Sequence, residues 1–477
     1  MLKIIERLLP KGQFSRAVGL LAGGTAGAQV LMVVAAPLLT RLYSPEDFGL
    51  LAVYSALLAL FSVNSSLRYQ LAIPLPDNDE DASHIVALSL ICVALVTFLC
   101  TVLALFSSNE TAALLKAPLL TSYLWLLPIG VGAVGTYQVF NYWALRKKNY
   151  AAVAVTRIKQ AVVTLIIQLI GCKFGAIALV AGQAGGQGVG SYSLAKQALG
   201  QLKFRRLRWK GILDAAKRYR NFPYYSTWDA FFNTAGVHLP PLLFATLFSP
   251  SAAGLYALAH RVLAVPMSVI GDAVGKVFFS NAPEALRQGK LETMVMDVHS
   301  KLVIIAMPPV FILFVAGPEL FAFVFGDRWQ QAGEFARWMA PWLYLVFVTG
   351  PLTTLFAVLE KQLHGLWFQA ALIFLRLAAV SIGAFYENLI LTVILFSLAS
   401  SFCWAALLLW VGINTGNAPI KILRTSIKAG LGSCVCVLPL WLSLHFMFLN
   451  DWWLCFLILS IVMMLLFYNK NLLAVLQ

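Results

Sequence analysis

The chain has 477 residues, of which 60% are hydrophobic and only 12% charged, and its formal net charge is +15. Soluble globular proteins carry about a quarter charged residues, so this composition excludes a soluble fold. Apolar runs of about 20 residues recur along the chain and predict an all-α membrane protein, because a helix satisfies its own backbone hydrogen bonds in lipid.

The first predicted element follows a basic N-terminal segment. Its apolar run, 17–39, is longer than the core of a cleaved signal peptide, so we expect an uncleaved first membrane span. Later apolar runs bring the total to fourteen predicted transmembrane helices. Their approximate ranges are 17–39, 48–73, 85–106, 119–142, 151–171, 174–195, 223–248, 253–279, 302–325, 334–358, 363–384, 388–411, 427–448 and 452–468.

The distribution of basic residues supports this number of spans. If the N-terminus lies in the cytoplasm, the inner segments hold 26 of the 35 Lys and Arg residues and the outer loops hold five. Cytoplasmic loops are enriched in Lys and Arg, and a miscounted helix would invert every later loop. The sequence therefore predicts fourteen spans with both termini in the cytoplasm.

One motif occurs twice. Residues 42–53 (LYSPEDFGLLAV) and 247–258 (LFSPSAAGLYAL) are 205 positions apart, and each is a Ser-Pro turn with a Gly four residues after the Pro. On the span map both copies lie in outer loops and run in the same direction. An internal duplication is typical of transporters, so we predict two parallel six-helix repeats followed by two extra C-terminal helices.

These elements predict four segments. They are an N-lobe (1–195), a basic cytoplasmic linker (196–221), a C-lobe (222–412) and the two extra spans (413–477). The linker combines Lys and Arg with a loose apolar stripe, which fits a helix on the cytoplasmic face attracted to anionic lipid. A topology determinant that only joins the halves is the simpler alternative, and we do not expect nucleic-acid binding.

Charged residues inside spans are costly and are therefore functional candidates. Guanidinium groups bind phosphate bidentately, so a cavity lined by cations favours an anionic substrate. The candidates for this cationic, substrate-binding cavity are Arg68, Arg261, Lys276 and Arg376. Arg68 could instead extend its side chain to the lipid headgroups.

Two carboxylates are candidates for binding a coupling ion. Asp229 lies near the inner end of span seven and could instead pair with a nearby Arg. Asp272 lies four residues before Lys276, so the two share a helix face and could form an ion pair. His238 fits a structural hydrogen bond better than a proton relay.

Small and polar residues also recur in the spans. Glycines at four-residue spacing predict close helix contacts, with a sliding seam as the alternative. They are Gly19, Gly23 and Gly27 in the first span and Gly182, Gly186 and Gly190 in the sixth. Polar side chains suited to sugars or to helix–helix bonding are Gln138, Asn141, Gln183 and Gln187.

The acidic run 77–81 (DNDED) resembles the start of a calcium loop. It lacks the Gly at the sixth position and the Glu at the twelfth, so helix capping is favoured. The sequence shows no zinc spacing, phosphate loop or nucleophile motif. We therefore expect no metal site, no catalytic residues and no ATP hydrolysis.

Two segments carry a family resemblance. Residues 41–50 (RLYSPEDFGL) and 68–74 (RYQLAIP) resemble the bacterial Wzx-type polysaccharide and O-antigen flippases of the multidrug/oligosaccharidyl-lipid/polysaccharide exporter superfamily. Length, span number and internal repeat extend the resemblance over the whole chain. The lipid II flippases of that superfamily also have fourteen spans.

The resemblance implies a secondary-active flippase of the bacterial inner membrane. It would move undecaprenyl-pyrophosphate-linked oligosaccharides from the cytoplasmic to the periplasmic leaflet by alternating access, for lipopolysaccharide or other surface polysaccharide biosynthesis. A proton or sodium gradient would drive it, without a cofactor. The implied partners are the lipid-linked oligosaccharide, membrane lipids, a polysaccharide polymerase and a chain-length regulator.

Two other functions remain open. A multidrug or metabolite exporter of the same fold would favour an acidic cavity, and the first six predicted spans contain no carboxylate. A membrane polymerase or glycosyltransferase would need a sizeable outer loop for its catalytic site, whereas every predicted outer loop is short.

Overall fold

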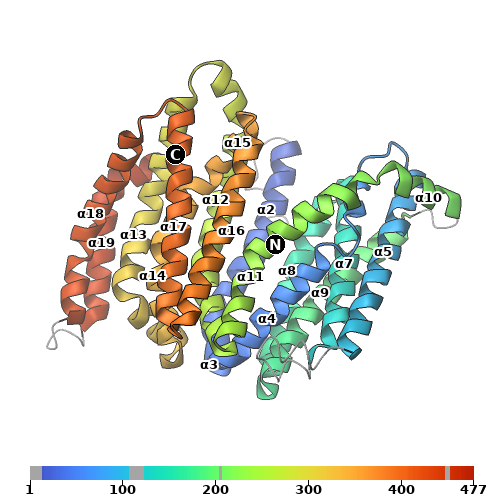
Figure 1. Ribbon diagram of the computed structural model, residues 1–477, viewed down its shortest axis with the longest axis horizontal. Coiled ribbons are helices and arrows are strands. Elements are labelled where there is room, and N and C mark those ends of the chain that lie inside the picture. The colour runs from blue at the N-terminus through green and yellow to red at the C-terminus, as the bar shows by residue number, and fades with distance from the viewer. Residues whose placement is uncertain (1–12, 107–122, 203–206, 446–451, 477) are drawn as a thin grey trace. The chain divides into compact units, whose positions relative to one another are not determined.

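The computed structural model describes residues 13–106, 123–202, 207–445 and 452–476 (Figure 1). Within these ranges every regular element is a helix. The chain forms two compact units, Met1–Ala257 and Leu258–Gln477, and the long helix α12 (Pro250–Arg287) contributes to both. The predicted all-α fold is confirmed, whereas the lobe boundaries drawn from the sequence stay a prediction.

In the first unit, α7, α8 and α9 pack against one another, α2 packs on α8, and α4 packs on α9 and α11. The helices of this unit before α12 are α2 (Gln13–Val34), α3 (Ala36–Leu42), α4 (Pro45–Ser62), η1 (Tyr69–Ala72), α5 (Asp79–Phe106), α7 (Leu126–Arg146), α8 (Tyr150–Ile170), η3 (Cys172–Phe174), α9 (Ala176–Leu199), α10 (Trp209–Arg218), η5 (Phe222–Ser226) and α11 (Thr227–Leu247).

In the second unit, α13 packs on α14 and α18, α14 packs on α17, and α18 packs on α19. The helices that follow α12 are α13 (Leu291–Phe325), η6 (Asp327–Trp329), α14 (Gln330–Thr349), η7 (Gly350–Thr354), α15 (Leu355–Val358), α16 (Gln362–Phe385), α17 (Leu389–Asn414), α18 (Pro419–His445) and α19 (Trp453–Leu476).

Each of the fourteen predicted spans overlaps a helix of the described residues. Nine helices of the described residues are long and apolar enough to cross a membrane, or ten if the two parts of α12, which bends by 41° between Val265 and Met267, form one span. Helices α7, α9 and α11 are not among these, and α19 contributes a shorter apolar stretch, Trp453–Tyr468. Polar and small residues lower the hydropathy of the helices that fall short.

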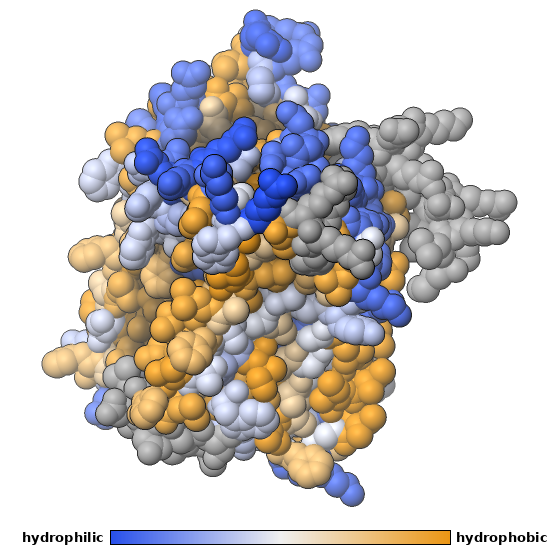
Figure 2. All heavy atoms as spheres, turned by 90° about the vertical axis from the view of Figure 1, so that its right-hand side faces the viewer, coloured by the Kyte–Doolittle hydropathy of each residue, from blue (hydrophilic) through white to orange (hydrophobic). Residues whose placement is uncertain are grey.

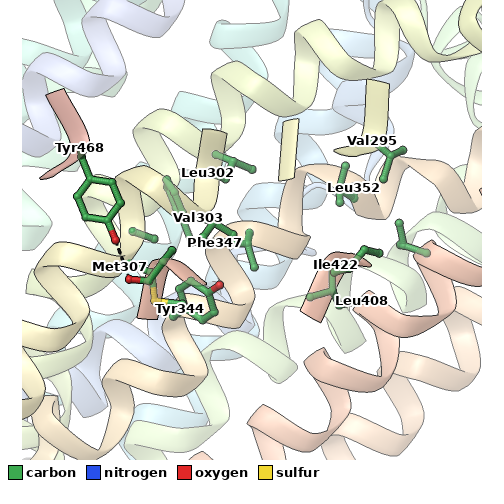
Figure 3. Close-up of a cluster of buried hydrophobic side chains, with 14 of the residues drawn as sticks. Val295, Leu302, Val303, Met307, Tyr344, Phe347, Leu352, Leu408, Ile422 and Tyr468 are labelled. Atoms are coloured by element: carbon green, nitrogen blue, oxygen red, sulfur yellow. Dashed lines mark hydrogen bonds between the residues drawn. The ribbon is translucent and has the colours of Figure 1, made fainter. Parts of the chain in front are cut away.

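The core of the second unit includes the two extra C-terminal helices. Figure 3 shows Tyr468 of α19 beside the cluster formed by α13, α14 and α18. The Tyr468 hydroxyl donates to the Ala429 carbonyl at 2.7 Å, and Ser433 Oγ lies 2.9 Å from the same hydroxyl. These bonds satisfy a buried phenol, so α18 and α19 are integral to this unit's core.

The second predicted span is wrong at its inner end. It was expected over 48–73, but α4 ends at Ser62 and turns follow before the short helix η1. Leu67 and Arg68 have φ values of +50° and +65°, which a right-handed helix cannot contain. Ser65 Oγ also donates to the Ser62 carbonyl at 2.9 Å, and such local hydrogen bonds compete with a continuing helix.

The two copies of the repeated turn lie against each other within the first unit. A Cβ atom built at Gly49 would lie 1.7 Å from the Pro250 carbonyl oxygen. The reciprocal contact places a Cβ at Gly254 2.0 Å from the Pro45 carbonyl oxygen. Each glycine therefore lets its helix N-terminus meet the proline of the other copy, so the Pro-Gly spacing that the two copies share permits a close approach of the backbones.

Both copies keep a serine cap, in which Ser249 Oγ of the second copy accepts from the Ala252 amide at 3.2 Å, but the first copy carries further anchors. Ser44 and Asp47 form a reciprocal capping box at the start of α4. The hydroxyl of Tyr43 donates to the Gln168 carbonyl, and burial raises the pKa of Tyr43 to about 12, so the donor stays protonated. The second copy has Phe248 and Ala252 at the positions equivalent to Tyr43 and Asp47, so it lacks both anchors.

The sixth-span glycine ladder makes the predicted close contacts, but the first-span ladder does not. Built Cβ atoms at Gly182, Gly186 and Gly190 would lie 2.6, 2.0 and 2.0 Å from Gln168, Thr164 and Gln160 of α8, respectively. In α2, a Cβ at Gly23 or Gly27 would meet nothing within 4 Å among the described residues; Gly24 instead packs on Ala154. The prediction for α2 placed the contact one residue too early.

The acidic run 77–81 caps and anchors the start of α5. The Asn78 side chain accepts from the Asp81 amide at 2.7 Å, so the segment caps the helix as predicted, but through Asn78 and not through an Asp or Ser83, whose hydroxyl donates to the Asp79 carbonyl. Arg146 Nε donates to Asp79 at 3.2 Å, and its Nη1 donates to the Pro76 carbonyl at 2.5 Å. Lys147 also pairs with Asp79. Arg146 therefore fastens the loop before α5 to the end of α7.

We expect Arg146→Ala to lower the free energy of unfolding by about 2 kcal/mol, because it leaves loop carbonyls and a carboxylate without their donor. Arg146→Lys should recover only part of this, since an ammonium group lacks the fork that reaches both partners. Thermal unfolding of purified protein in detergent measures the change. Lys159→Ala, at an exposed position of α8, is the control; an equal loss there would contradict the assignment.

The predicted linker contains the short helix α10. Ile212 and Ala215 are buried, whereas Trp209 is 67% exposed, and the Arg208 amide donates to His84 Nε2 of α5 at 3.2 Å. Figure 2 shows apolar side chains across the middle of the face that carries α5, with hydrophilic side chains gathered toward its top. The basic residues at 1–12 and 203–206 that entered the topology prediction lie outside the described residues.

Candidate functional site

Arg376, predicted as a substrate-binding cation, lies in a group of aromatic and polar side chains in the second unit. Its Nε donates to Ser400 Oγ at 2.9 Å. Its guanidinium carbon lies 5.0 Å from the ring centroids of both Trp342 and Phe396. His260 stacks on Trp342 with centroids 6.0 Å apart. We call these five residues, from α12, α14, α16 and α17, the Arg376 cluster.

The guanidinium of Arg376, which is partly buried, lies against two aromatic rings that are themselves buried. Trp342 and Phe396 meet edge to face at 5.4 Å, and only 4% and 1% of their surfaces are exposed. A cation held over two such rings gains about 2 kcal/mol when desolvated. The Trp342 Nε1 group is buried without a hydrogen-bond partner among the described residues. The cluster thus presents a permanent positive charge held by buried rings, and a guanidinium group suits phosphate oxygens.

The other predicted residues of the second unit lie on α12. Arg261 follows His260 directly and is partly buried, whereas Asp272 and Lys276 are exposed. Within the described residues no ion pair joins Asp272 to Lys276, so the expected neutralising pair does not form.

Arg68 lies in the first unit, at the break that follows α4. Neighbouring Ser66 and Gln70 are buried and hydrogen-bond to each other, and Gln70 Nε2 donates to Gln138 Oε1 of α7 at 3.3 Å. The Nε of Arg68 is buried and has no hydrogen-bond partner in the described part of the chain. The sequence pattern did not show that Arg68 lies at a break in the helix and not inside a continuous span.

Asp229, the other predicted ion-binding carboxylate, lies in α11, and its side chain is outside the described residues. His238 is on the same helix and partly buried. Sequence reasoning missed His260, Trp342, Phe396 and Ser400 of the Arg376 cluster. Aromatic residues in apolar runs look like core or lipid-facing side chains, so only their spatial relation to Arg376 distinguishes them.

The comparisons with known proteins give a consistent picture. A family model described as polysaccharide biosynthesis protein matches residues 38–334. The succinoglycan biosynthesis transport protein ExoT of Rhizobium meliloti (strain 1021) is 24% identical over 333 residues, which cover 67% of this chain. The matched part spans only 64% of that relative's length.

Solved structures show the same fold at low identity. The lipid II flippase MurJ in an inward closed conformation matches with a TM-score of 0.77 and 12% identity, covering 95% of this chain and 99% of that one. An inward-facing multidrug resistance MATE family transporter matches with a TM-score of 0.59 and 14% identity, covering 89% and 98%. At these identities the matches establish the all-helical transporter fold.

Proposed function

This chain belongs to the polysaccharide biosynthesis protein family, and from that premise we propose that it is a secondary-active flippase for undecaprenyl-pyrophosphate-linked oligosaccharides. It would move them from the cytoplasmic to the periplasmic leaflet of the inner membrane by alternating access, for surface polysaccharide biosynthesis. Both termini would lie in the cytoplasm. A polysaccharide polymerase and a chain-length regulator would be its partners.

The Arg376 cluster is the observation that carries this proposal beyond membership of a transport family. An arginine held against Trp342 and Phe396 inside membrane-crossing helices offers a permanent cation. Such a guanidinium group suits the pyrophosphate of a lipid-linked oligosaccharide, because it can bind phosphate oxygens bidentately. Cationic drugs would be repelled by the same group, which disfavours the multidrug alternative.

The remaining predicted residues take supporting roles in the proposal. Arg68, Arg261 and Lys276 would contribute further positive charge for pyrophosphate or acidic sugars. Asp229 or Asp272 would bind the coupling proton or sodium ion, since a carboxylate can hold either. No cofactor is required for such transport, because the ion gradient supplies the energy.

Reconstituted transport tests the proposal. Purified protein in liposomes should move a fluorescent undecaprenyl-pyrophosphate oligosaccharide between leaflets when a proton or sodium gradient is imposed, as measured by loss of accessibility to an external quencher. Empty liposomes and liposomes without a gradient are the controls. Movement of a cationic dye in place of the lipid would support the multidrug exporter instead. Chain elongation of the oligosaccharide would identify a polymerase.

A further inference from the structure

The short helix α10 (Trp209–Arg218) is fixed on the first unit by one of its faces. Ile212 and Ala215 are buried on that face, and α10 packs against α5. A Cβ atom built at Gly211 would lie 2.6 Å from Nε2 of His84, so the absence of a side chain there lets the two helices approach closely. Figure 1 shows α10 at the edge of the unit, beside the start of α5.

A second face of α10 exposes apolar and basic side chains together. Trp209 is 67% exposed and Leu213 46%, and Lys210 and Lys217 are also exposed. The other three residues stand three or four positions from Leu213, so the four side chains are neighbours on the helix surface. We call these four residues the outer face of α10. Tryptophan is enriched where membrane proteins meet the headgroups, and basic residues beside apolar ones characterise helices that lie in that layer.

The segment that contains α10 carries positive charge that the described chain does not neutralise. Residues 207–220 hold five basic residues and one acidic residue, Asp214. All five basic side chains are exposed, and no ion pair of the described residues includes one of them. In the acidic run at the start of α5, the ion pairs join Asp79 to Arg146 and Lys147 and not to α10. A partner of this segment is therefore expected to be anionic.

The contact with α5 also indicates the depth of α10 in the membrane. His84, which lies against α10, is only 6% exposed. On the same face of α5, exposed apolar side chains begin seven residues later with Ile91 and continue with Leu95 and Phe98. Seven residues of helix span about 10 Å, so α10 lies outside the lipid-facing apolar surface of α5, at the level of the phospholipid headgroups. Figure 2 shows this order, with apolar side chains across the middle of the face and hydrophilic ones toward its top.

We infer that the outer face of α10 binds the headgroups of anionic phospholipids in the bilayer around the protein. Lys210 and Lys217 would contact the phosphate groups, while Trp209 and Leu213 insert between the headgroups. The inference is independent of the proposed function, because it uses only the exposed face of α10 and its depth. An acidic protein or a nucleic acid in the cytoplasm would match the charge but would not provide an apolar layer at headgroup depth. A segment that served topology alone would need the basic residues but not the exposed Trp209 and Leu213 beside them.

Fluorescence quenching of Trp209 in reconstituted bilayers tests the inference. The purified full chain is placed in equimolar mixtures of phosphatidylglycerol, which is anionic, and phosphatidylcholine, which is zwitterionic, with one or the other brominated on its acyl chains. Bromine quenches tryptophan on contact, so the two mixtures report which lipid lies beside Trp209. The chain has 13 tryptophans, so the Trp209 signal is the difference between a protein and the same protein with Trp209→Phe.

We expect phosphatidylglycerol to be favoured over phosphatidylcholine at Trp209 by about fivefold or more, because each basic residue near an anionic surface strengthens the attraction by about a factor of five. Lys210→Gln combined with Lys217→Gln should bring the two lipids to about equal contact. High salt should weaken the wild-type preference in the same way, because it screens exposed charges.

A charge-matched double variant in the second unit is the control. Arg287→Gln combined with Lys290→Gln removes the same charge from exposed positions between α12 and α13, and it should keep the wild-type lipid preference at Trp209. Both double variants should unfold at the wild-type temperature in phosphatidylcholine alone, since the replaced side chains are exposed and belong to no ion pair of the described residues.

Equal contact of the two lipids with Trp209 in the wild type would overturn the inference, as would an unchanged preference after Lys210→Gln and Lys217→Gln. Absence of quenching by either lipid would also overturn it and would assign the outer face of α10 to a cytoplasmic partner. A preference lost equally in the control variant would show that the net charge of the protein, and not α10, attracts the anionic lipid.

Discussion

Replacement of Arg376 with Ala should reduce export of surface glycan by about 10- to 100-fold in a strain that lacks the native protein, scored by polysaccharide output at matched expression. A charge-assisted hydrogen bond to a ligand contributes about 1.5–3 kcal/mol, which corresponds to that range. The substitution also removes the cation from the rings of Trp342 and Phe396. Both effects act on the step that holds the anionic substrate.

A conservative variant of Arg376 and a control variant elsewhere on the surface show whether Arg376 acts in substrate binding or only in the stability of the fold. Arg376→Lys keeps the charge but not the planar fork, so it should restore only a minor part of the output. Arg287→Ala, at an exposed position at the end of α12, is the matched control and should export normally. Full glycan output from Arg376→Ala at normal expression would refute the role of the Arg376 cluster in transport.

Gly254→Val should lower the free energy of unfolding by about 3 kcal/mol or more, with a matching loss of folded protein in the membrane. The new Cβ would lie 2.0 Å from the Pro45 carbonyl oxygen, and backbone cannot yield as a flexible side chain can. Overpacking of this kind costs about 1–3 kcal/mol even where side chains absorb it. Thermal unfolding in detergent and the yield of folded protein measure the effect.

Two further variants complete this experiment, one at Gly49 in the other copy of the turn and one at Gly188, where there is space for a side chain. Gly49→Val should be as damaging, because its Cβ would lie 1.7 Å from the Pro250 carbonyl oxygen. At Gly188 of α9 a Cβ would meet nothing within 4 Å among the described residues, so Gly188→Val is the control. Wild-type stability of both turn variants would show that the two turns do not need their close contact.

Much of the fold was predictable because long apolar runs in a sequence identify membrane helices. All fourteen predicted spans overlap a helix of the described residues, and the repeated Ser-Pro turn marks corresponding helix starts. The break after Ser62 was not predictable, because the run through Ala72 and Ile73 remains apolar enough to continue a span. It depends on two left-handed residues, Leu67 and Arg68, neither of which is a glycine that would signal such a conformation.

The candidate site was predictable only in part. The cost of burying a charge in the membrane singled out Arg376 as a candidate, but this argument gave none of its partners, such as Ser400. Trp342 is 34 residues from Arg376 and reaches it from another helix, so neither periodicity nor spacing connects them. Arg157 was counted among the cytoplasmic residues of its loop, although two turns of α8 precede it and its guanidinium lies against Tyr137.

The glycine-rich α9 has a consequence for how the protein is made. Helix α9 is not among the helices of the described residues that are apolar enough to cross a membrane by composition, and its sequence holds glycines and glutamines in place of apolar side chains. Its close fit to α8, where Gln168 Nε2 donates to the Leu179 carbonyl at 3.1 Å, offers the missing stabilisation. Because α8 directly precedes α9 in the chain, it is already synthesised when α9 emerges. The two helices can therefore enter the membrane together as a hairpin.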